Sequence, residues 1–255
     1  MMLSGLEGRT AFVTGAGGGI GLAVVDLLER SGVSVYATDL KLDALKTRSS
    51  EAVKILELDV RNAEQVMDAV KAAKSATGHI DFGVNVAGVL STLEVRDTSE
   101  EEWNRVFAVN ATGVYFVSRA LAAVMVPRRQ GCIVTVGSNS AAVARRNMSA
   151  YAASKAAAAM FMRCLGLELA EFGIRCNVVA AGSTRTPMQT ALWKAGTGEE
   201  AVLNGSLSMY RAGIPLRKLA TPADIANAVV FLLSDEASHI TMADIYVDGG
   251  ASLRG

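Results

Sequence analysis

Residues 9–21 read RTAFVTGAGGGIG, and this stretch decides the fold. Its first six residues are mostly apolar, which is typical of a short buried strand. Five glycines then fall within seven residues, and residues 20–31 continue with the spacing of an amphipathic helix. A strand, a glycine-rich turn and a helix in direct succession predict the first unit of an α/β fold.

The glycine turn is suited to a dinucleotide. Gly15 permits a tight turn, Gly19 lets the backbone approach a pyrophosphate, and Gly21 allows the helix to pack closely. The amino end of the helix that follows faces the phosphate charge. An ordinary turn between a strand and a helix is the alternative, because glycines cluster there too. We expect six residues to contact the cofactor: Gly15, Gly17, Gly18, Gly19, Ile20 and Gly21.

The end of the next strand predicts which cofactor is used. Residues 33–38 form an apolar strand that leads into Asp39 and Leu40, and Asp39 follows Gly21 by 18 residues. A carboxylate at this position accepts hydrogen bonds from the adenosine ribose and repels a 2′-phosphate. Lys41 is close enough to soften that repulsion, although a solvated lysine at a helix start is the simpler interpretation. The pattern favours NAD over NADP.

Strands and helices alternate along the rest of the chain. Predicted strands cover residues 53–58, 81–86, 131–137, 174–179 and 245–247, and predicted helices cover residues 62–76, 98–107, 111–126, 149–170 and 221–233. This alternation predicts one domain over residues 1–255, a doubly wound parallel sheet (a Rossmann fold) with helices on both faces. Cofactors bind at the carboxyl ends of the strands in such sheets. The residues that we expect there are Asp59, Val60, Asn85, Ala87, Gly88, Ser138 and Thr184, with a purely structural role as the alternative for Gly88 and for Asn85, which can brace the sheet.

Composition argues against several other classes of protein. Lys and Arg together number 25, as do Asp and Glu, so no basic surface indicates a nucleic-acid partner. No unbroken run of about 18 apolar residues predicts a membrane span, and the N-terminus lacks the pattern of a signal peptide. The three widely spaced cysteines fit reduced thiols in a cytoplasmic protein, not a disulfide framework or a metal site. Both histidines, His79 and His239, stand outside any motif and are interpreted as structural.

Tyr151 and Lys155 are the candidate acid–base pair. They belong to an alanine-rich run, residues 149–170, that predicts a helix, and residues four apart share a helix face. An ammonium beside a phenol favours the phenolate, so we expect a lowered pKa for Tyr151. A phenolate near neutral pH accepts a proton from an alcohol. Taken alone, this pair is also what coincidence places on an arbitrary helix.

All these motifs together resemble the short-chain dehydrogenase/reductase family over essentially the whole chain. The matching residues are Thr14-Gly15-x-x-x-Gly19-Ile20-Gly21, Asp59-Val60, Asn85-Val86-Ala87-Gly88, Asn110, Ser138, Tyr151-x-x-x-Lys155, Asn177 and Thr184. The resemblance implies a catalytic tetrad in which Tyr151 is the base and Ser138 holds the substrate oxygen. Lys155 would lower the tyrosine pKa and bind the nicotinamide ribose, and Asn110 would position a water in a proton relay. One departure is Ala181-Gly182, where the family usually has Pro-Gly.

A closer similarity joins the chain to a subgroup of this family. Its matching stretches are residues 133–136, 148–151, 175–179, 188–189, 192–193, 213–216 and 237–250. The subgroup uses NAD to oxidise the C3 alcohol of an isochorismate-derived cyclohexadiene acid, 2,3-dihydro-2,3-dihydroxybenzoate, in catechol siderophore biosynthesis. The resemblance implies substrate contacts from Ser138, Arg145, Met148, Tyr151, Gly182 and Met188. Arg145 would pair with the substrate carboxylate, unless it is simply an exposed loop arginine beside Arg146.

Two departures from the subgroup leave the ring substituent open. Ser91-Thr92 stands where an arginine is typical, and Arg185 and Pro187 stand where aspartates are usual. A substrate with a 2-amino group, trans-2,3-dihydro-3-hydroxyanthranilate, would undergo the same chemistry. A reductase of an unrelated ketone and a dinucleotide-binding sensor without turnover are the other hypotheses, and the complete tetrad disfavours the sensor.

Two further expectations concern mobility and assembly. Residues 183–214 carry repeated glycines and little periodicity, which predicts a substrate loop that closes over the site, with a plain connection as the alternative. The small residues Ala152, Ala156 and Ala159 would let two copies of the catalytic helix approach closely. Together with the family's habit of pairing these helices, they suggest a homotetramer.

Overall fold

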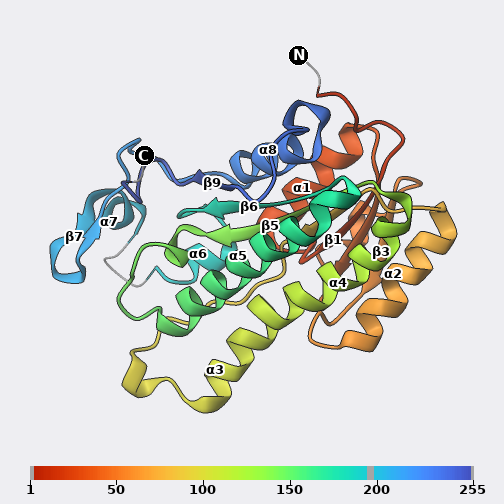
Figure 1. The fold of residues 1–255 in the computed structure, drawn as a ribbon. Coiled ribbons are helices and arrows are strands. Elements are labelled where there is room, and N and C mark those ends of the chain that lie inside the picture. Colours follow the sequence, from red (N-terminus) through yellow and green to blue (C-terminus); the bar gives the residue numbers. More distant parts are fainter. Residues whose placement is uncertain (1–2, 194–197, 254–255) are drawn as a thin grey trace.

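The computed structural model describes residues 3–193 and 198–253, and its centre is a parallel sheet of seven strands (Figure 1). The strands run in the order β3-β2-β1-β4-β5-β6-β9, and every neighbouring pair is parallel. Their bounds are β1 Thr10–Thr14, β2 Ser34–Asp39, β3 Val53–Glu57, β4 Phe82–Asn85, β5 Gly131–Ser138, β6 Ile174–Ala181 and β9 Asp244–Val247. The predicted doubly wound fold is confirmed.

Helices cover both faces of the sheet. On one face, α1 (Gly19–Arg30) packs against α8 (Pro222–Leu233) over a core that includes Val24, Leu28 and Val229. On the other face lie α2 (Ala63–Thr77), α4 (Val114–Met125) and α5 (Ser149–Leu169). Strands β1, β4, β5 and β6 are therefore apolar on both sides, as their nearly continuous runs of buried residues show, whereas the edge strands β3 and β9 are less buried.

The starts of α2, α3 (Glu100–Phe107) and α8 follow local sequence signals. Asn62 accepts hydrogen bonds from the backbone N–H groups of Glu64 and Gln65 and so caps α2. Thr221 and Asp224 form a reciprocal capping box at α8. At α3 the cap is one-sided, because Ser99 accepts a hydrogen bond from the Glu102 N–H while the Glu102 side chain pairs with Arg105.

One helical stretch has the length and composition of a membrane span. It runs from Glu100 to Arg128, through α3, a π-helical turn at Ala108–Gly113 and α4. It does not stand out as an unbroken apolar run because Arg119 interrupts it. Val117, Leu121 and Met125 on its inner face are buried in the core between α4 and the sheet. The fold therefore accounts for its apolar composition.

The segment at residues 183–214 is more regular than predicted. Its described part forms α6 (Pro187–Thr190), α7 (Glu199–Asn204) and an antiparallel hairpin of β7 (Gly205–Ser206) and β8 (Arg211–Ala212), whereas residues 194–197 lie outside the described residues. In Figure 1 α7 and β7 stand beyond the carboxyl end of the sheet, away from the helices that cover its faces. Its role as a closing loop stays a prediction.

The strand order places a topological switch between β1 and β4. From β1 the chain builds outward to β2 and β3, and then crosses to β4, β5 and β6 on the other side. Because the two connections leave in opposite directions, a crevice opens at the carboxyl ends of these strands, where ligands bind in such sheets.

Candidate active site

A cavity of about 650 Å³ opens at the carboxyl ends of β4, β5 and β6. Ten of the residues predicted to contact cofactor or substrate line it: Ile20, Gly88, Ser138, Arg145, Met148, Tyr151, Lys155, Gly182, Thr184 and Met188. They come from positions up to 168 residues apart, from Ile20 to Met188, and the parallel sheet brings them together. The remaining predicted cofactor residues lie outside this cavity, mostly at the ends of β1, β2 and β3.

The glycine turn has the geometry that a dinucleotide requires. Gly15 has a φ of +66°, and a Cβ there would lie 2.4 Å from the backbone nitrogen of Ala87. A Cβ on Gly21 would lie 2.0 Å from the carbonyl oxygen of Gly15, so only glycine lets α1 pack this closely. The amino end of α1 is consequently held against the switch point, and these residues fit the phosphates of a nicotinamide dinucleotide.

Asp39 is held in place at the end of β2. Its carboxylate accepts hydrogen bonds from the backbone N–H of Gly17 at 2.9 Å and from that of Lys41 at 3.1 Å. The carboxylate thus joins the glycine turn to the neighbouring strand end, where an adenosine ribose is expected. Leu40 beside it is half exposed, and the ribose role of Asp39 stays a prediction.

Two predicted cofactor contacts have other partners in the structure. Asp59 pairs with Arg61 at 2.6 Å, and this hydrogen-bonded guanidinium lowers the pKa of the carboxyl. Asn85 is buried, and its side-chain amide donates to the hydroxyls of Ser118 and Thr135, each at 3.0 Å. Asn85 therefore braces the sheet against α4, one of the two roles that its place at a strand end predicts, and its contact with the cofactor stays a prediction.

Asn110 sits in the π-helical turn and is fully buried. Its side chain accepts a hydrogen bond from the Val89 N–H at 2.8 Å and donates to the Val89 carbonyl and to Ser154. Ser154 donates in turn to the Tyr151 carbonyl oxygen at 2.7 Å. Asn110 thus connects the loop after β4 to the catalytic helix, a link that a π-bulge at a functional site commonly provides. The predicted water relay is a further role that these contacts leave untested.

Ser138 ends β5 and faces Tyr151 on the next helix. Its hydroxyl lies 2.8 Å from the Ser140 hydroxyl and accepts a hydrogen bond from the Ser140 N–H. A hydrogen bond between Ser138 and Tyr151 lowers the pKa of the phenol, although burial acts more strongly in the opposite direction. The two hydroxyls of Ser138 and Tyr151 are therefore adjacent, as a shared substrate oxygen requires.

The pKa of Tyr151 differs from its prediction. Burial raises the pKa of this phenol above its ordinary value, whereas we expected the neighbouring ammonium to lower it. The reason is the placement of Lys155, whose Nζ donates to the Val136 carbonyl oxygen at 3.0 Å and lies 6.0 Å from the centre of the tyrosine ring. Burial also lowers the pKa of Lys155 to about 8.

Gly88 shows how tightly the tetrad is assembled. A Cβ on this residue would lie 3.3 Å from Nζ of Lys155 and 3.4 Å from the side-chain oxygen of Asn110. The loop after β4 therefore passes directly beside both groups, and a larger side chain would separate them.

The substrate side of the cavity contains one functional candidate that the sequence patterns did not indicate. Arg145, predicted to meet a carboxylate, is half-buried there. Arg211 from the β7–β8 hairpin lines the same cavity, and its Nη2 donates to the Ser183 hydroxyl at 2.9 Å. A strand of two residues has no periodicity, so only the fold reveals where Arg211 lies.

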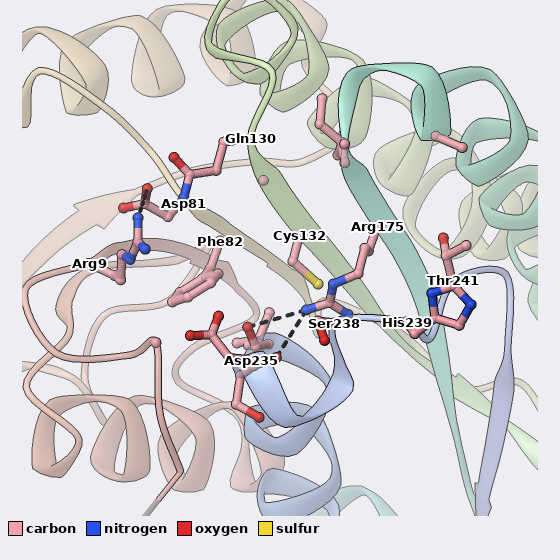
Figure 2. Close-up of a pocket in the computed structure, with 17 residues that line it drawn as sticks. Arg9, Asp81, Phe82, Gln130, Cys132, Arg175, Asp235, Ser238, His239 and Thr241 are labelled. Atoms are coloured by element: carbon pink, nitrogen blue, oxygen red, sulfur yellow. Dashed lines mark hydrogen bonds and ion pairs between the residues drawn. The ribbon is translucent and has the colours of Figure 1, made fainter.

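A second cavity, of about 540 Å³, lies at the opposite edge of the sheet (Figure 2). It is lined by residues at the amino ends of β1, β4, β5 and β6, and two of its arginines are paired within the chain. Arg9 pairs with Asp81, and Arg175 donates to the carbonyl oxygens of Leu233 and Ser234. The described lining of this cavity contains none of the four predicted tetrad residues, so it lacks the chemistry of the first.

Comparisons with known proteins agree with this geometry. A family model described as enoyl-(acyl carrier protein) reductase, of the short-chain alcohol dehydrogenase type, matches residues 15–252. The chain is 48% identical to the 2,3-dihydro-2,3-dihydroxybenzoate dehydrogenase of Bacillus subtilis (strain 168), over 99% of both chains. It is 41% identical to the enzyme of that name from Escherichia coli (strain K12), over 97% of this chain and 98% of the relative.

Two further comparisons extend this similarity. The vibriobactin-specific 2,3-dihydro-2,3-dihydroxybenzoate dehydrogenase of Vibrio cholerae is 41% identical over 97% of both chains. Among solved structures, the Thermoplasma acidophilum aldohexose dehydrogenase superposes with a TM-score of 0.87 at 31% identity, covering 99% of this chain and 97% of the other. The similarity thus extends over the full fold and not only over the glycine turn.

The buried lysine predicts a pH dependence of stability. Because the pKa of Lys155 is about 8 in the folded chain and 10.5 ordinarily, the unfolded chain binds this proton more tightly. The cost of burying the charged amine is complete below pH 8 and disappears as the pH rises toward 10.5. The free energy of unfolding of the wild type should therefore rise over this range, relative to Lys155→Met, by on the order of 3 kcal/mol.

Chemical denaturation at a series of pH values measures this difference. Lys71→Met, which removes an exposed lysine from α2, is the matched control and should show no such slope. A difference between wild type and Lys155→Met that stays constant from pH 7 to 10 would show that Lys155 is not buried as a cation.

Proposed function

We propose that this chain, which belongs to the short-chain dehydrogenase/reductase family, oxidises the C3 hydroxyl of 2,3-dihydro-2,3-dihydroxybenzoate with NAD. The observation that carries the proposal is the placement of Ser138 and Tyr151 in a cavity whose charged lining, among the described residues, is entirely basic. Full-length identity of 41–48% to dehydrogenases of this substrate supports the same conclusion. The product is a catechol acid, and we place the reaction in siderophore biosynthesis.

The hydroxyl groups at the end of β5 and the start of α5 bind the reacting alcohol. Ser138 holds the C3 oxygen, and Tyr151 accepts its proton, because both hydroxyls line the same cavity close to one another. When bound, the nicotinamide supplies an acceptor for the hydride that leaves C3. Lys155, held by the Val136 carbonyl with its Nζ 6.0 Å from the centre of the Tyr151 ring, would bind the nicotinamide ribose.

Loss of the alcohol proton and of the hydride leaves a ketone at C3. The proton at C2 then departs and the C3 oxygen gains a proton, so the ring becomes aromatic and two hydrogens have been removed in total. Because aromatisation is strongly favourable, it draws the oxidation forward. The chain's part is to orient the ring and to remove one proton.

The charge of the cavity favours a neutral substituent at C2. Among the described residues that line it, four are basic and none is an aspartate or glutamate. Arg185, which stands where the subgroup usually has an acid, pairs with Glu199. A ring ammonium would find no carboxylate partner here, so we assign the 2-hydroxyl substrate rather than the 2-amino one.

Replacing Tyr151 by phenylalanine tests the base directly. Removal of the hydroxyl should lower kcat for 2,3-dihydro-2,3-dihydroxybenzoate by about 10²- to 10⁴-fold, while the Kd for NAD changes less than about threefold. Formation of the aromatic product and of NADH is followed by absorbance and fluorescence. Tyr115→Phe, which removes a hydroxyl from the surface of α4, is the control. Unchanged turnover in Tyr151→Phe, or a wild type that leaves the dihydrodiol untouched, refutes the proposal.

Asp39 predicts the cofactor preference. The wild type should use NAD with a kcat/KM at least about 100-fold above that for NADP, because a 2′-phosphate would meet this carboxylate. Asp39→Asn keeps an acceptor for the Gly17 N–H but loses the charge, and should narrow the gap to about tenfold or less. Steady-state kinetics with both cofactors measure this preference. Equal kcat/KM values for NAD and NADP in the wild type would contradict the role of Asp39.

We also propose that the chain assembles as a cytoplasmic homotetramer through α4 and α5. Tyr115, Met160 and Leu167 are exposed apolar residues of these helices, whereas Ala159, one of the predicted contact residues, is buried within its own chain. Covering this apolar surface would favour association. Light scattering coupled to size exclusion should give four times the mass of one chain, and a monomer at micromolar concentration would rule the assembly out.

A further inference from the structure

The active-site cavity concentrates positive charge without balancing it. Its basic residues are Arg145, Arg146, Lys155 and Arg211, and among the described lining residues there is no acid. Burying like charges together is costly unless an anion joins them. The cavity is therefore built to receive a negatively charged ligand.

Two of these cations already have neutral partners that account for their positions. Lys155 donates to the Val136 carbonyl oxygen at 3.0 Å. Arg146 is exposed and donates to the Ser208 carbonyl oxygen at 3.1 Å, which ties the turn before α5 to the β7–β8 hairpin. Lys155 is thus fixed beside Tyr151 and Arg146 is exposed, whereas the other two arginines are half-buried and are the stronger candidates for the anion.

Arg211 is the less compensated of the two remaining arginines. It is half-buried, its Nη2 donates to the neutral Ser183 hydroxyl, and no carboxylate lies within 4.0 Å among the described residues. Arg145 lies near enough for its charge to lower the pKa of Arg211, in addition to the lowering by burial. The hairpin thus holds one guanidinium close to another across the same cavity.

Arg145 has an acid nearby that is otherwise engaged. The charge of Asp248 acts on it, but the oxygens of that carboxylate accept hydrogen bonds from Asn139, Ser252 and the Gly250 N–H. Within the described residues, Arg145 and Asp248 form no ion pair. Both arginines therefore retain donors for a ligand.

We propose that Arg211 is a specificity-determining residue that, with Arg145, binds the ring carboxylate of the substrate from the β7–β8 hairpin. This inference rests on the proposed function, since it assigns a role to the acid group of that substrate. Guanidinium groups present paired N–H donors that match the two oxygens of a carboxylate. Two of them lining one cavity and bound to one carboxylate would fix the ring in one orientation, and the hairpin becomes part of the binding site.

Binding of the aromatic product separates this role from turnover. The complex with NADH is titrated with 2,3-dihydroxybenzoate and with its neutral carboxamide by calorimetry. The wild type should bind the acid at least about tenfold more tightly than the amide. Arg211→Gln should weaken the affinity for the acid by about 10- to 100-fold and change the affinity for the amide by less than about threefold. Arg211→Lys should recover part of the loss because it restores the charge.

Arg217→Gln is the matched control. Arg217 follows the hairpin, is exposed, and donates to the Asn204 side chain outside the cavity, so its loss should alter neither affinity by more than about threefold. In steady-state oxidation, Arg211→Gln should raise KM for the acid and leave kcat within about threefold, as expected when binding is lost equally from ground and transition states.

Several outcomes would overturn the inference. If the wild type binds the acid and the amide with equal affinity, there is no cationic site for the carboxylate, and this result holds even if Arg211→Gln fails to fold. If Arg211→Gln binds the acid with unchanged affinity while the wild type oxidises the dihydrodiol, the role of Arg211 is refuted and the proposed function stands. If Arg211→Gln loses as much affinity for NADH as for the acid, Arg145 and Arg211 bind the cofactor phosphates and not the substrate carboxylate. A wild type that oxidises no dihydrodiol acid removes the proposed function and this inference together.

Discussion

The hydrogen bond from the Lys155 ammonium to the Val136 carbonyl oxygen, 3.0 Å long, is the contact on which the active site depends. It holds α5 against the carboxyl end of strand β5 and so determines where Tyr151 lies relative to Ser138. It also keeps a cation in a buried position, where burial lowers the pKa of the amine to about 8. The sheet thus stabilises a charge that the fold alone would disfavour.

Burial has opposite consequences for the two members of the pair. It raises the pKa of Tyr151 and lowers that of Lys155, so each group is biased toward its neutral form. The proton transfer requires the ionised phenol, and the neighbouring Ser138 hydroxyl lowers the pKa of Tyr151 against the larger effect of burial. In the proposed complex, a substrate carboxylate at Arg145 and Arg211 would neutralise the two arginines and leave the Lys155 ammonium beside Tyr151. Substrate binding would then use the arginines, and proton transfer would use Tyr151.

Local patterns predicted the elements that carry the chemistry. The glycine turn, the alternating strands and the spacing of Tyr151 and Lys155 depend on residues close in sequence, and the structure places all of them as expected. The details that differ depend on contacts between distant residues. The Asn85 amide donates to Ser118 and Thr135 in the core. The Lys155 ammonium donates to a backbone carbonyl of β5 and not to the Tyr151 phenol. Sequence patterns do not identify Arg211 as a site residue, because its position depends on the packing of the hairpin against the loop after β6.

The most direct test is a crystal structure of the chain with NADH and 2,3-dihydroxybenzoate bound. The oxygen on C3 of the ring should lie within hydrogen-bond distance, about 2.6–3.2 Å, of the Tyr151 hydroxyl and close to Ser138. The ring carboxylate should face the opposite end of the cavity. A ring whose C3 oxygen lies beyond about 4 Å from Tyr151, or whose carboxylate occupies the position beside Ser138, would contradict the assignment of Tyr151 as the base for this alcohol.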